Sequence, residues 1–236
     1  MKKLLAVISA IFVFSHSVFA LERSDLSVTA GISANSAVYG ASGKETNRAE
    51  NNTVKTIKNE SGVFTDSHMS GFLELNVGEF VSLGFEHTPD SISTPENQRT
   101  TNRNNTDGTS STTRVSADFN DLNIAYLKLN IPGGVYLKAG YVETDVDVKE
   151  TMASGSTYNN VSTEGTLVGV GFSKALGERG IAIRLEGSYM DLDDVTSSNG
   201  VSATGGSKAN GGRNQIDISN MEGLNGKIAL TYTFGQ

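Results

Sequence analysis

Residues 227–234 read KIALTYTF, in which large apolar side chains alternate with small or polar ones and the last residue is aromatic. Successive side chains of a β-strand point to opposite faces. One face of this segment therefore carries Ile228, Leu230, Tyr232 and Phe234, and the other carries Lys227, Ala229, Thr231 and Thr233. A strand with one apolar and one polar face suits a wall between lipid and a hydrated interior. The segment predicts the closing strand of a membrane-spanning β-barrel.

Seven further segments show the same alternation and bring the predicted number of strands to eight. They lie near residues 26–38, 67–77, 81–87, 125–131, 135–141, 166–172 and 181–189. Three short connections join them in pairs: Gly78-Glu79, Pro132-Gly133-Gly134 and residues 175–180. Glycine and proline are the residues that tight turns require. No proline falls within a predicted strand, as expected for a central strand of a sheet.

Long polar stretches alternate with the three short turns. They cover about residues 40–66, 88–113, 149–163 and 192–216 and are rich in Asn, Ser, Thr and Gly. Short turns on one side and long loops on the other are typical of outer-membrane barrels, with turns in the periplasm and loops outside the cell. The prediction is an all-β, antiparallel, up-and-down transmembrane barrel with four long extracellular loops and three short periplasmic turns. Ten strands, with part of the first or second loop recruited, is the alternative.

A soluble sandwich or a lipocalin-like barrel is the main rival, because alternation also suits those folds. The N-terminus argues against it. Lys2 and Lys3 precede an apolar run over residues 4–14, and Val18-Phe19-Ala20 supplies small residues at the positions that a signal peptidase reads. This pattern predicts a secretory signal peptide over residues 1–20 and a single barrel domain over residues 21–236. The apolar run is too short to span a bilayer as a helix, which needs roughly 20 residues.

Composition excludes several classes of function. The full chain has 19 basic and 26 acidic side chains, and removal of residues 1–20, with two lysines and no acid, leaves a net charge of −9. Nucleic-acid binding is therefore not expected, since phosphates require a basic surface. The chain has no cysteine, so neither disulfides nor a thiolate nucleophile is available. No later segment approaches the 18 apolar residues of a membrane helix, which leaves a barrel as the only way to span lipid.

The polar face of the predicted strands carries seven charged residues. These residues are Glu74, Glu86, Lys128, Lys138, Arg184, Glu186 and Lys227. An eight-stranded barrel is just filled by its inward side chains, and buried charges must be paired or solvated. The expectation is a salt-bridged network that plugs the lumen. A gated or narrow conductance through the same residues is the alternative.

Catalytic and metal sites are not predicted. His68, near Ser70, is expected to face inward, and His87 to lie at the extracellular rim before Asp90 and Ser91. Neither context is specific for a hydrolase or acyltransferase. The acidic clusters Asp145/Asp147 and Asp191/Asp193/Asp194 lack the spacing of a calcium-binding loop. We predict no catalytic residue, no metal ligand and no cofactor.

The C-terminal strand is similar to the assembly signal of outer-membrane barrels. Lys227, Ala229, Tyr232 and Phe234 occupy its positions, although Ala229 replaces the usual glycine and Gly235-Gln236 follow the final Phe. Along residues 21–236 the chain resembles the small eight-stranded barrels of the opacity-protein and OmpA/OmpX-like type, through topology and this ending.

The resemblance implies a non-enzymatic protein of the cell outer membrane with a role as surface antigen, adhesin or envelope component. Its implied partners are outer-membrane lipid, lipopolysaccharide, the barrel-assembly machinery and an extracellular ligand or a host or phage surface that contacts the polar loops. A narrow channel or hydrophobic-ligand conduit like OmpW is the alternative function, and a lipid-modifying enzyme that uses His68 or His87 is a third.

Overall fold

The computed structural model describes residues 26–48, 53–102, 110–151, 157–199 and 213–235. Eight of its strands pair in a closed antiparallel ring. In ring order they are β1 (Leu26–Arg48), β2 (Val54–Val77), β3 (Val81–Thr88), β6 (Ser110–Asn130), β7 (Val135–Thr151), β8 (Val161–Ala175), β9 (Ile181–Leu192) and β11 (Gln215–Phe234), and β1 closes the ring against β11. Three shorter strands extend the sheet beyond it: β4 (Ile92–Ser93) and β5 (Asn97–Asn102) pair with β6, and β10 (Val195–Ser198) pairs with β11. The predicted all-β barrel is confirmed.

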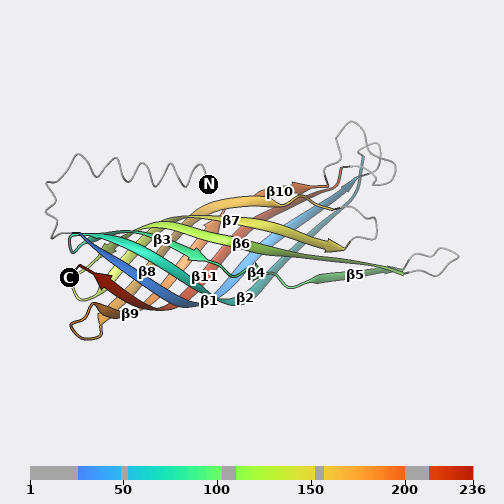
Figure 1. Ribbon diagram of the computed structural model, residues 1–236. Helices are drawn as coiled ribbons and strands as arrows, with labels where there is room; N and C mark the ends of the chain where they lie inside the picture. The colour runs from blue at the N-terminus through green and yellow to red at the C-terminus, as the bar shows by residue number, and fades with distance from the viewer. Residues whose placement is uncertain (1–25, 49–52, 103–109, 152–156, 200–212, 236) are drawn as a thin grey trace.

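The stagger of the strands follows from their register. A path of paired residues starts at Val28 and runs through Leu75, Leu83, Leu127, Ala139, Val168, Tyr189 and Leu224. It returns to β1 at Val38, ten residues beyond its start. A closed barrel with such a shift needs strands tilted by roughly 35–45° from its axis, and the strands slant accordingly in Figure 1. Each step around the ring also moves toward the extracellular end, so strands far apart in sequence contribute to one level of the lumen.

The two faces of the wall have the predicted chemistry. Leu127, Leu185 and Leu230 point outward and are 40%, 52% and 51% exposed, whereas the inward Glu74 and Glu86 are 2% and 3% exposed. This is the reverse of a soluble protein with an apolar core, and it is the arrangement of a barrel that presents its apolar side to lipid. Among the described residues, no helix is long and apolar enough to cross a membrane.

Glycines on the inner face make room for aromatic rings on neighbouring strands. The ring of Phe72 lies on Gly31, that of Tyr126 on Gly84 and that of Tyr136 on Gly171. A Cβ atom at these three glycines would lie 2.2–2.3 Å from the ring above it. At these three positions the ring of one strand is accommodated because the paired residue on the adjacent strand has no side chain.

The strands are longer than predicted, and the loops are correspondingly shorter. Most of the stretch 40–66 is a hairpin of β1, which continues to Arg48, and β2, which begins at Val54. Stretch 88–113 contains β4, β5 and the start of β6, and stretches 149–163 and 192–216 are also partly strand. The prediction of four long loops was therefore wrong in its lengths. Outside the membrane both faces of a hairpin meet water, so polar, threonine-rich sequence forms strands without the apolar alternation that reveals them.

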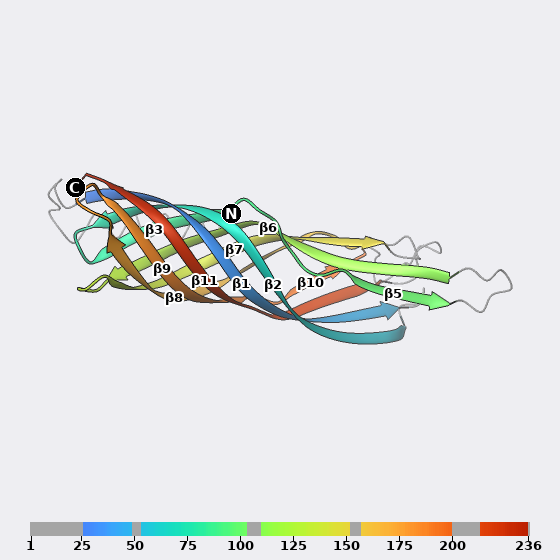
Figure 2. The same ribbon diagram turned by 90° about the horizontal axis from the view of Figure 1, so that it is seen from below.

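The three short turns lie where they were predicted. Gly78, Gly133 and Gly134 have φ values of 62°, 94° and 90°, which only glycine adopts without strain. The start of β1 and the end of β11 lie beside these turns, because Leu26 pairs with Val77, next to Gly78, and Val28 pairs with Phe234. At the opposite end, β5 and the start of β6 project farther than the neighbouring strands (Figure 2). The predicted signal peptide, residues 1–20, lies outside the described residues.

Candidate functional site: an ion-pair network and an apolar cup in the lumen

Glu74 on β2 lies at the centre of one group of charges. Arg184 on β9 donates to both carboxylate oxygens, with Nη1···Oε1 and Nη2···Oε2 distances of 2.7 and 2.9 Å. Lys128 Nζ donates to Oε2 at 2.6 Å, and the Tyr126 hydroxyl donates to Oε1 at 2.9 Å. The Glu74 side chain is 1% exposed. A buried carboxylate tolerates such desolvation only when it accepts several charge-assisted hydrogen bonds, as this one does.

Glu86 on β3 and Glu186 on β9 form a second group nearer the extracellular end. Lys227 Nζ contacts both oxygens of Glu86 at 2.7 Å, and Lys138 Nζ contacts Oε2 at 2.9 Å. The same two ammonium groups reach Glu186 Oε1 at 3.2 Å. The Ser70 hydroxyl also donates to Glu86, at 2.6 Å. Two lysines are thus shared between two carboxylates.

Two tyrosines connect the groups. The Tyr126 ring lies under the ammonium group of Lys138, 4.1 Å from centroid to Nζ, while its hydroxyl bonds Glu74. Tyr136 donates its hydroxyl to Glu186 at 3.0 Å, and its ring lies 5.4 Å from Lys128 Nζ. Sequence reasoning did not single out these tyrosines, although their parity on the strands places them on the inner face.

The structure brings the seven charged residues of the polar face together in one continuous network. They come from β2, β3, β6, β7, β9 and β11, six of the eight ring strands. The network therefore crosses the lumen in several directions rather than lining one wall. Every one of the seven has an opposite charge within 3.2 Å.

A small chamber lies on the extracellular side of the network. Its free volume is about 20 Å³, and its walls combine polar side chains such as Asn35 and His68 with apolar ones such as Ile124 and Leu167. The Nδ1 atom of His68 lies 3.9 Å from Asp66 Oδ1. Ser70 hydrogen-bonds Glu86 and Ser33 rather than this histidine. The chamber therefore marks the change from charged and polar side chains to apolar ones along the lumen.

The other histidine, His87, is engaged by an amide. Its Nδ1 lies 2.9 Å from Asn123 Oδ1. Asp90 accepts a hydrogen bond from the backbone N–H of Met69, at 3.4 Å. Within the described residues, neither histidine side chain is hydrogen-bonded to a hydroxyl nucleophile, as a Ser-His-carboxylate set would require.

The predicted acidic clusters bind neighbouring polar groups. Asp145 accepts from the Ser162 hydroxyl at 2.6 Å, and Asp147 accepts from Asn120 Nδ2 at 3.0 Å. Asp194 accepts from the backbone N–H of Asn220 at 3.3 Å. The described part of the chain holds no group of three or more His, Cys, Asp or Glu residues arranged for a metal ion.

The residues of the predicted assembly signal lie on both faces of β11. Lys227 and Ala229 are buried in the lumen, whereas Tyr232 and Phe234 are 43% and 53% exposed on the outside. The two rings meet edge to face, with centroids 4.6 Å apart. They lie beside the short turns, where aromatic girdles of membrane barrels contact the lipid headgroups.

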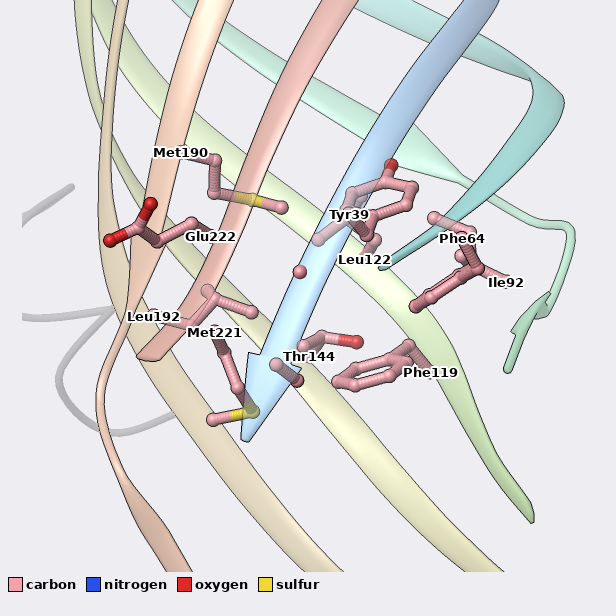
Figure 3. A pocket seen from close by; sticks show the side chains of 12 residues that line it. Tyr39, Phe64, Ile92, Phe119, Leu122, Thr144, Met190, Leu192, Met221 and Glu222 are labelled. Atoms are coloured by element: carbon pink, nitrogen blue, oxygen red, sulfur yellow. The ribbon is translucent and has the colours of Figure 1, made fainter. Parts of the chain in front are cut away.

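An apolar cup occupies the extracellular end of the lumen. Its wall is made by side chains from β1, β2, β4, β6, β7, β9 and β11, arranged around a common space in Figure 3. The large apolar members are Tyr39, Phe64, Ile92, Phe119, Leu122, Met190, Leu192 and Met221. The free volume between them is only about 30 Å³. We refer to these eight side chains as the cup.

Ile92 forms part of the wall of the cup although it does not belong to the ring. It is 3% exposed and belongs to the same buried apolar cluster as Leu122, Met190, Leu192 and Met221. Sequence analysis placed Ile92 in a polar loop, and the cup was not predicted. A lone branched aliphatic residue in a stretch dominated by Asn, Ser and Thr is the signal that could have pointed to it.

The fold and the two faces of its wall define a small membrane-spanning β-barrel of the outer-membrane type. No protein-family model matches the chain, and a comparison with curated proteins finds no match. Among solved structures it is similar to the outer membrane protein OprG from Pseudomonas aeruginosa, with 12% identity, a TM-score of 0.45 and coverage of 86% of this chain and 96% of that one.

Two other barrels are similar at the same level. The outer membrane protease OmpT from Escherichia coli has 11% identity, a TM-score of 0.44 and coverage of 92% and 98%. Ail, the attachment invasion locus protein of Yersinia pestis, has 12% identity, a TM-score of 0.37 and coverage of 86% and 99%. These identities and scores are too low to transfer any activity to this chain.

Proposed function

We propose that the protein is a non-enzymatic component of the bacterial outer membrane whose lumen is closed by its ion-pair network. The observation that carries this proposal is the set of contacts across the lumen. Arg184 on β9 forms an ion pair with Glu74 on β2, and Lys227 on β11 forms an ion pair with Glu86 on β3. Each of these pairs joins strands that are not neighbours in the ring, so the side chains span the interior.

The energetics of buried charge support a permanent seal. Removing one partner of a buried ion pair leaves an uncompensated charge and costs roughly 3–5 kcal/mol. A conductance pathway through the network would have to separate several such pairs at once, because Lys138 and Lys227 each serve both Glu86 and Glu186. This argues for a plug over the alternative of a narrow channel through the same residues.

A planar lipid bilayer with the purified protein tests the seal. We expect no conductance steps from the wild type, and steps from a Glu74→Ala/Arg184→Ala double variant, which loses both partners of the bidentate pair and their volume. Leu185→Ala, on the outer face of the same strand as Arg184, is the matched control and should stay silent. Heat-modifiable electrophoretic migration verifies that each variant is a folded barrel. Conductance from the wild type would overturn the proposal.

The surface role is assigned to the extracellular end. The strands β1, β2, β5 and β6 are extended at that end, where β5 and the start of β6 project farthest (Figures 1 and 2). Surface segments on a rigid scaffold are where recognition usually resides. We propose contact of these hairpins with lipopolysaccharide or with a host or phage surface, after insertion by the barrel-assembly machinery. Binding of whole cells to candidate surfaces, with and without residues 97–113, tests this role, and equal binding would contradict it.

A further inference from the structure

Two buried polar atoms line the chamber on the extracellular side of the network and have no hydrogen-bond partner among the described residues. They are His68 Nδ1 and Asn225 Oδ1. The distance of 3.9 Å from His68 Nδ1 to Asp66 Oδ1 is too long for a hydrogen bond. The His68 side chain is only 5% exposed, so bulk water does not reach it. Buried polar groups are almost always hydrogen-bonded, either within the protein or to an ordered water.

The neighbouring amides do not turn to supply the missing bonds. Asn225 Nδ2 donates to Asn35 Oδ1 at 3.1 Å. Asn35 Nδ2 donates in turn to Ser70 Oγ at 3.1 Å and to the backbone oxygen of His68 at 3.4 Å. A flip of the Asn225 amide would break the first of these bonds and set two acceptor oxygens against each other. The Asn225 Oδ1 atom therefore stays oriented to accept a hydrogen bond from a ligand.

Size and charge define that ligand. The free volume of the chamber is about 20 Å³, and a cavity needs roughly 10–15 Å³ of this kind to hold one water, so an organic molecule does not fit. A metal cation would face the ammonium group of Lys227, which lines the chamber. A chloride ion would face Asn225 Oδ1, which only accepts hydrogen bonds. A neutral molecule of the size of water, with both donors and acceptors, meets all of these limits.

We propose that the chamber is a binding site for one water molecule, which hydrogen-bonds to both His68 Nδ1 and Asn225 Oδ1. The water donates to Asn225, and it donates to or accepts from His68 according to the tautomer of the imidazole. Thr88 and Ser188 bring hydroxyl groups to the same wall, which gives the site the chemistry for the third bond that a buried water typically makes.

The bound water joins two strands that do not touch. His68 lies on β2 and Asn225 on β11, and β1 separates these strands in the ring. The water therefore extends the cross-lumen contacts of the ion-pair network by one further level toward the extracellular end.

Apolar side chains close the site toward the outside of the cell. Tyr39, Leu122 and Met190 line both the chamber and the cup (Figure 3). On the opposite side the chamber is lined by Glu86 and Lys227, which form an ion pair of 2.7 Å, and in this respect the inference rests on the proposed seal. A water held between these two layers exchanges slowly with the solvent. The cup thereby acquires a role, because it separates bulk water from the polar groups below it.

The position of the water provides the first test. A high-resolution crystal structure of the whole barrel should show one ordered water within about 3.2 Å of both His68 Nδ1 and Asn225 Oδ1. A chamber without electron density for a water would overturn the proposal.

A pair of variants tests which side chains hold the water. The double variant His68→Phe/Asn225→Leu replaces both polar groups by apolar ones of similar size. Measured by ¹⁷O relaxation dispersion in micelles, it should hold one long-lived water fewer than the wild type. His87→Phe, at the other histidine, is the matched control and should lose none. Heat-modifiable migration verifies that each variant is folded, and an unchanged number of long-lived waters in the double variant would contradict the assignment.

The closing role of the cup has its own readout, the residence time of the water. Met190→Ala thins the partition between chamber and cup and should shorten this time. Met69 is 55% exposed on the outer face, so Met69→Ala is the control and should leave the residence time unchanged. Equal residence times in the two variants would show that the cup does not enclose the site.

Conductance measured on the same samples keeps the two proposals apart. Electrical silence together with a chamber that holds no water would remove the binding site and leave the sealed barrel. An ordered water in a wild-type barrel that conducts would keep the binding site and remove the seal.

Discussion

The two halves of the lumen are built on the same strands but are held together by different forces. In the half near the short turns, seven charged side chains and two tyrosines form a network in which each ion has a fixed partner. In the extracellular half, β1, β6, β9 and β11 turn apolar side chains toward the same axis. The first half has directional contacts that tolerate little change, whereas the second has non-directional apolar contacts.

This difference indicates which half of the lumen tolerates substitution. When a buried ion pair is separated, each of its two charges is left without a counter-charge, which is unfavourable. An apolar contact can be replaced by another apolar contact of similar volume at a cost of less than about 1.5 kcal/mol. We therefore place the structural role in the ionic half and the exchangeable contacts in the cup.

The largest effect is expected from removal of a shared carboxylate. Glu86→Gln leaves Lys138 and Lys227 with only Glu186 as a counter-charge and should lower the free energy of unfolding by about 3–5 kcal/mol. Urea titration in lipid vesicles measures this. The double variant Glu86→Gln/Lys227→Met removes a charge of each sign and should recover part of the loss. If Glu86→Gln lowered the free energy of unfolding by less than Leu122→Ala in the cup does, the proposed difference between the two halves would be contradicted.

A smaller loss is expected from truncation in the cup. Leu122 is 5% exposed there, and Leu122→Ala should cost about 2–3 kcal/mol. The value lies at the low end for a buried leucine because the flexible Met190 and Met221 side chains can close on the space. Leu127→Ala, on the outer face of the same strand, is the control for loss of a leucine that contacts lipid. The same unfolding experiment measures this loss. A loss equal to that of Glu86→Gln would show that the cup tolerates substitution no better than the ionic half.

Crowding in the ionic half gives the next effect. Gly31→Ala places a Cβ 2.3 Å from Phe72 Cζ, so the ring must shift, and its contact with the Arg184 guanidinium, whose carbon lies 5.5 Å from the ring centroid, is disturbed. We expect a loss of about 1–2 kcal/mol. Gly71→Ala, where a Cβ meets nothing within 4 Å, should cost less, and Phe72→Leu should relieve the Gly31→Ala variant. Equal losses of stability at the two glycines would show that the side chains around Phe72 in the lumen are not tightly packed.

The smallest effect concerns pH and the strands beyond the membrane. The hydrogen bond from Lys149 lowers the pKa of Asp118, and burial opposes this shift. A carboxyl whose pKa is lowered on folding stabilises the fold above its unfolded-state pKa, and this contribution is lost as the pH falls through the folded-state pKa. The protection factors of the amides in the outer part of β6 and β7, which are exchange rates corrected for the intrinsic rate at each pH, should therefore fall between about pH 5 and pH 3. Asp118→Asn should lose this pH dependence, and an unchanged fall of the protection factors in the variant would contradict the assignment.

The membrane-spanning part of the fold was readable from the sequence because lipid imposes a strict rule. Every second residue must be apolar where a strand crosses the bilayer, and the segments near residues 81–87 and 227–234 follow it. The extensions of β1 and β2 were missed because no such rule holds where both faces meet water. The cup was missed for a related reason: Ile92 lies on β4, a strand of two residues, which is too short for an alternating pattern to reveal it.

The sequence by itself determined which face of each strand is apolar, where the chain turns at the short end and which seven charges face inward. These are local properties, since alternation and turn residues act over a few positions. Only the tertiary structure decided which charges meet, that Tyr126 and Tyr136 join them, and that an apolar cup lies above. The physical reason is the ten-residue stagger of the ring, which sets side chains from distant strands at one level and which no single strand encodes.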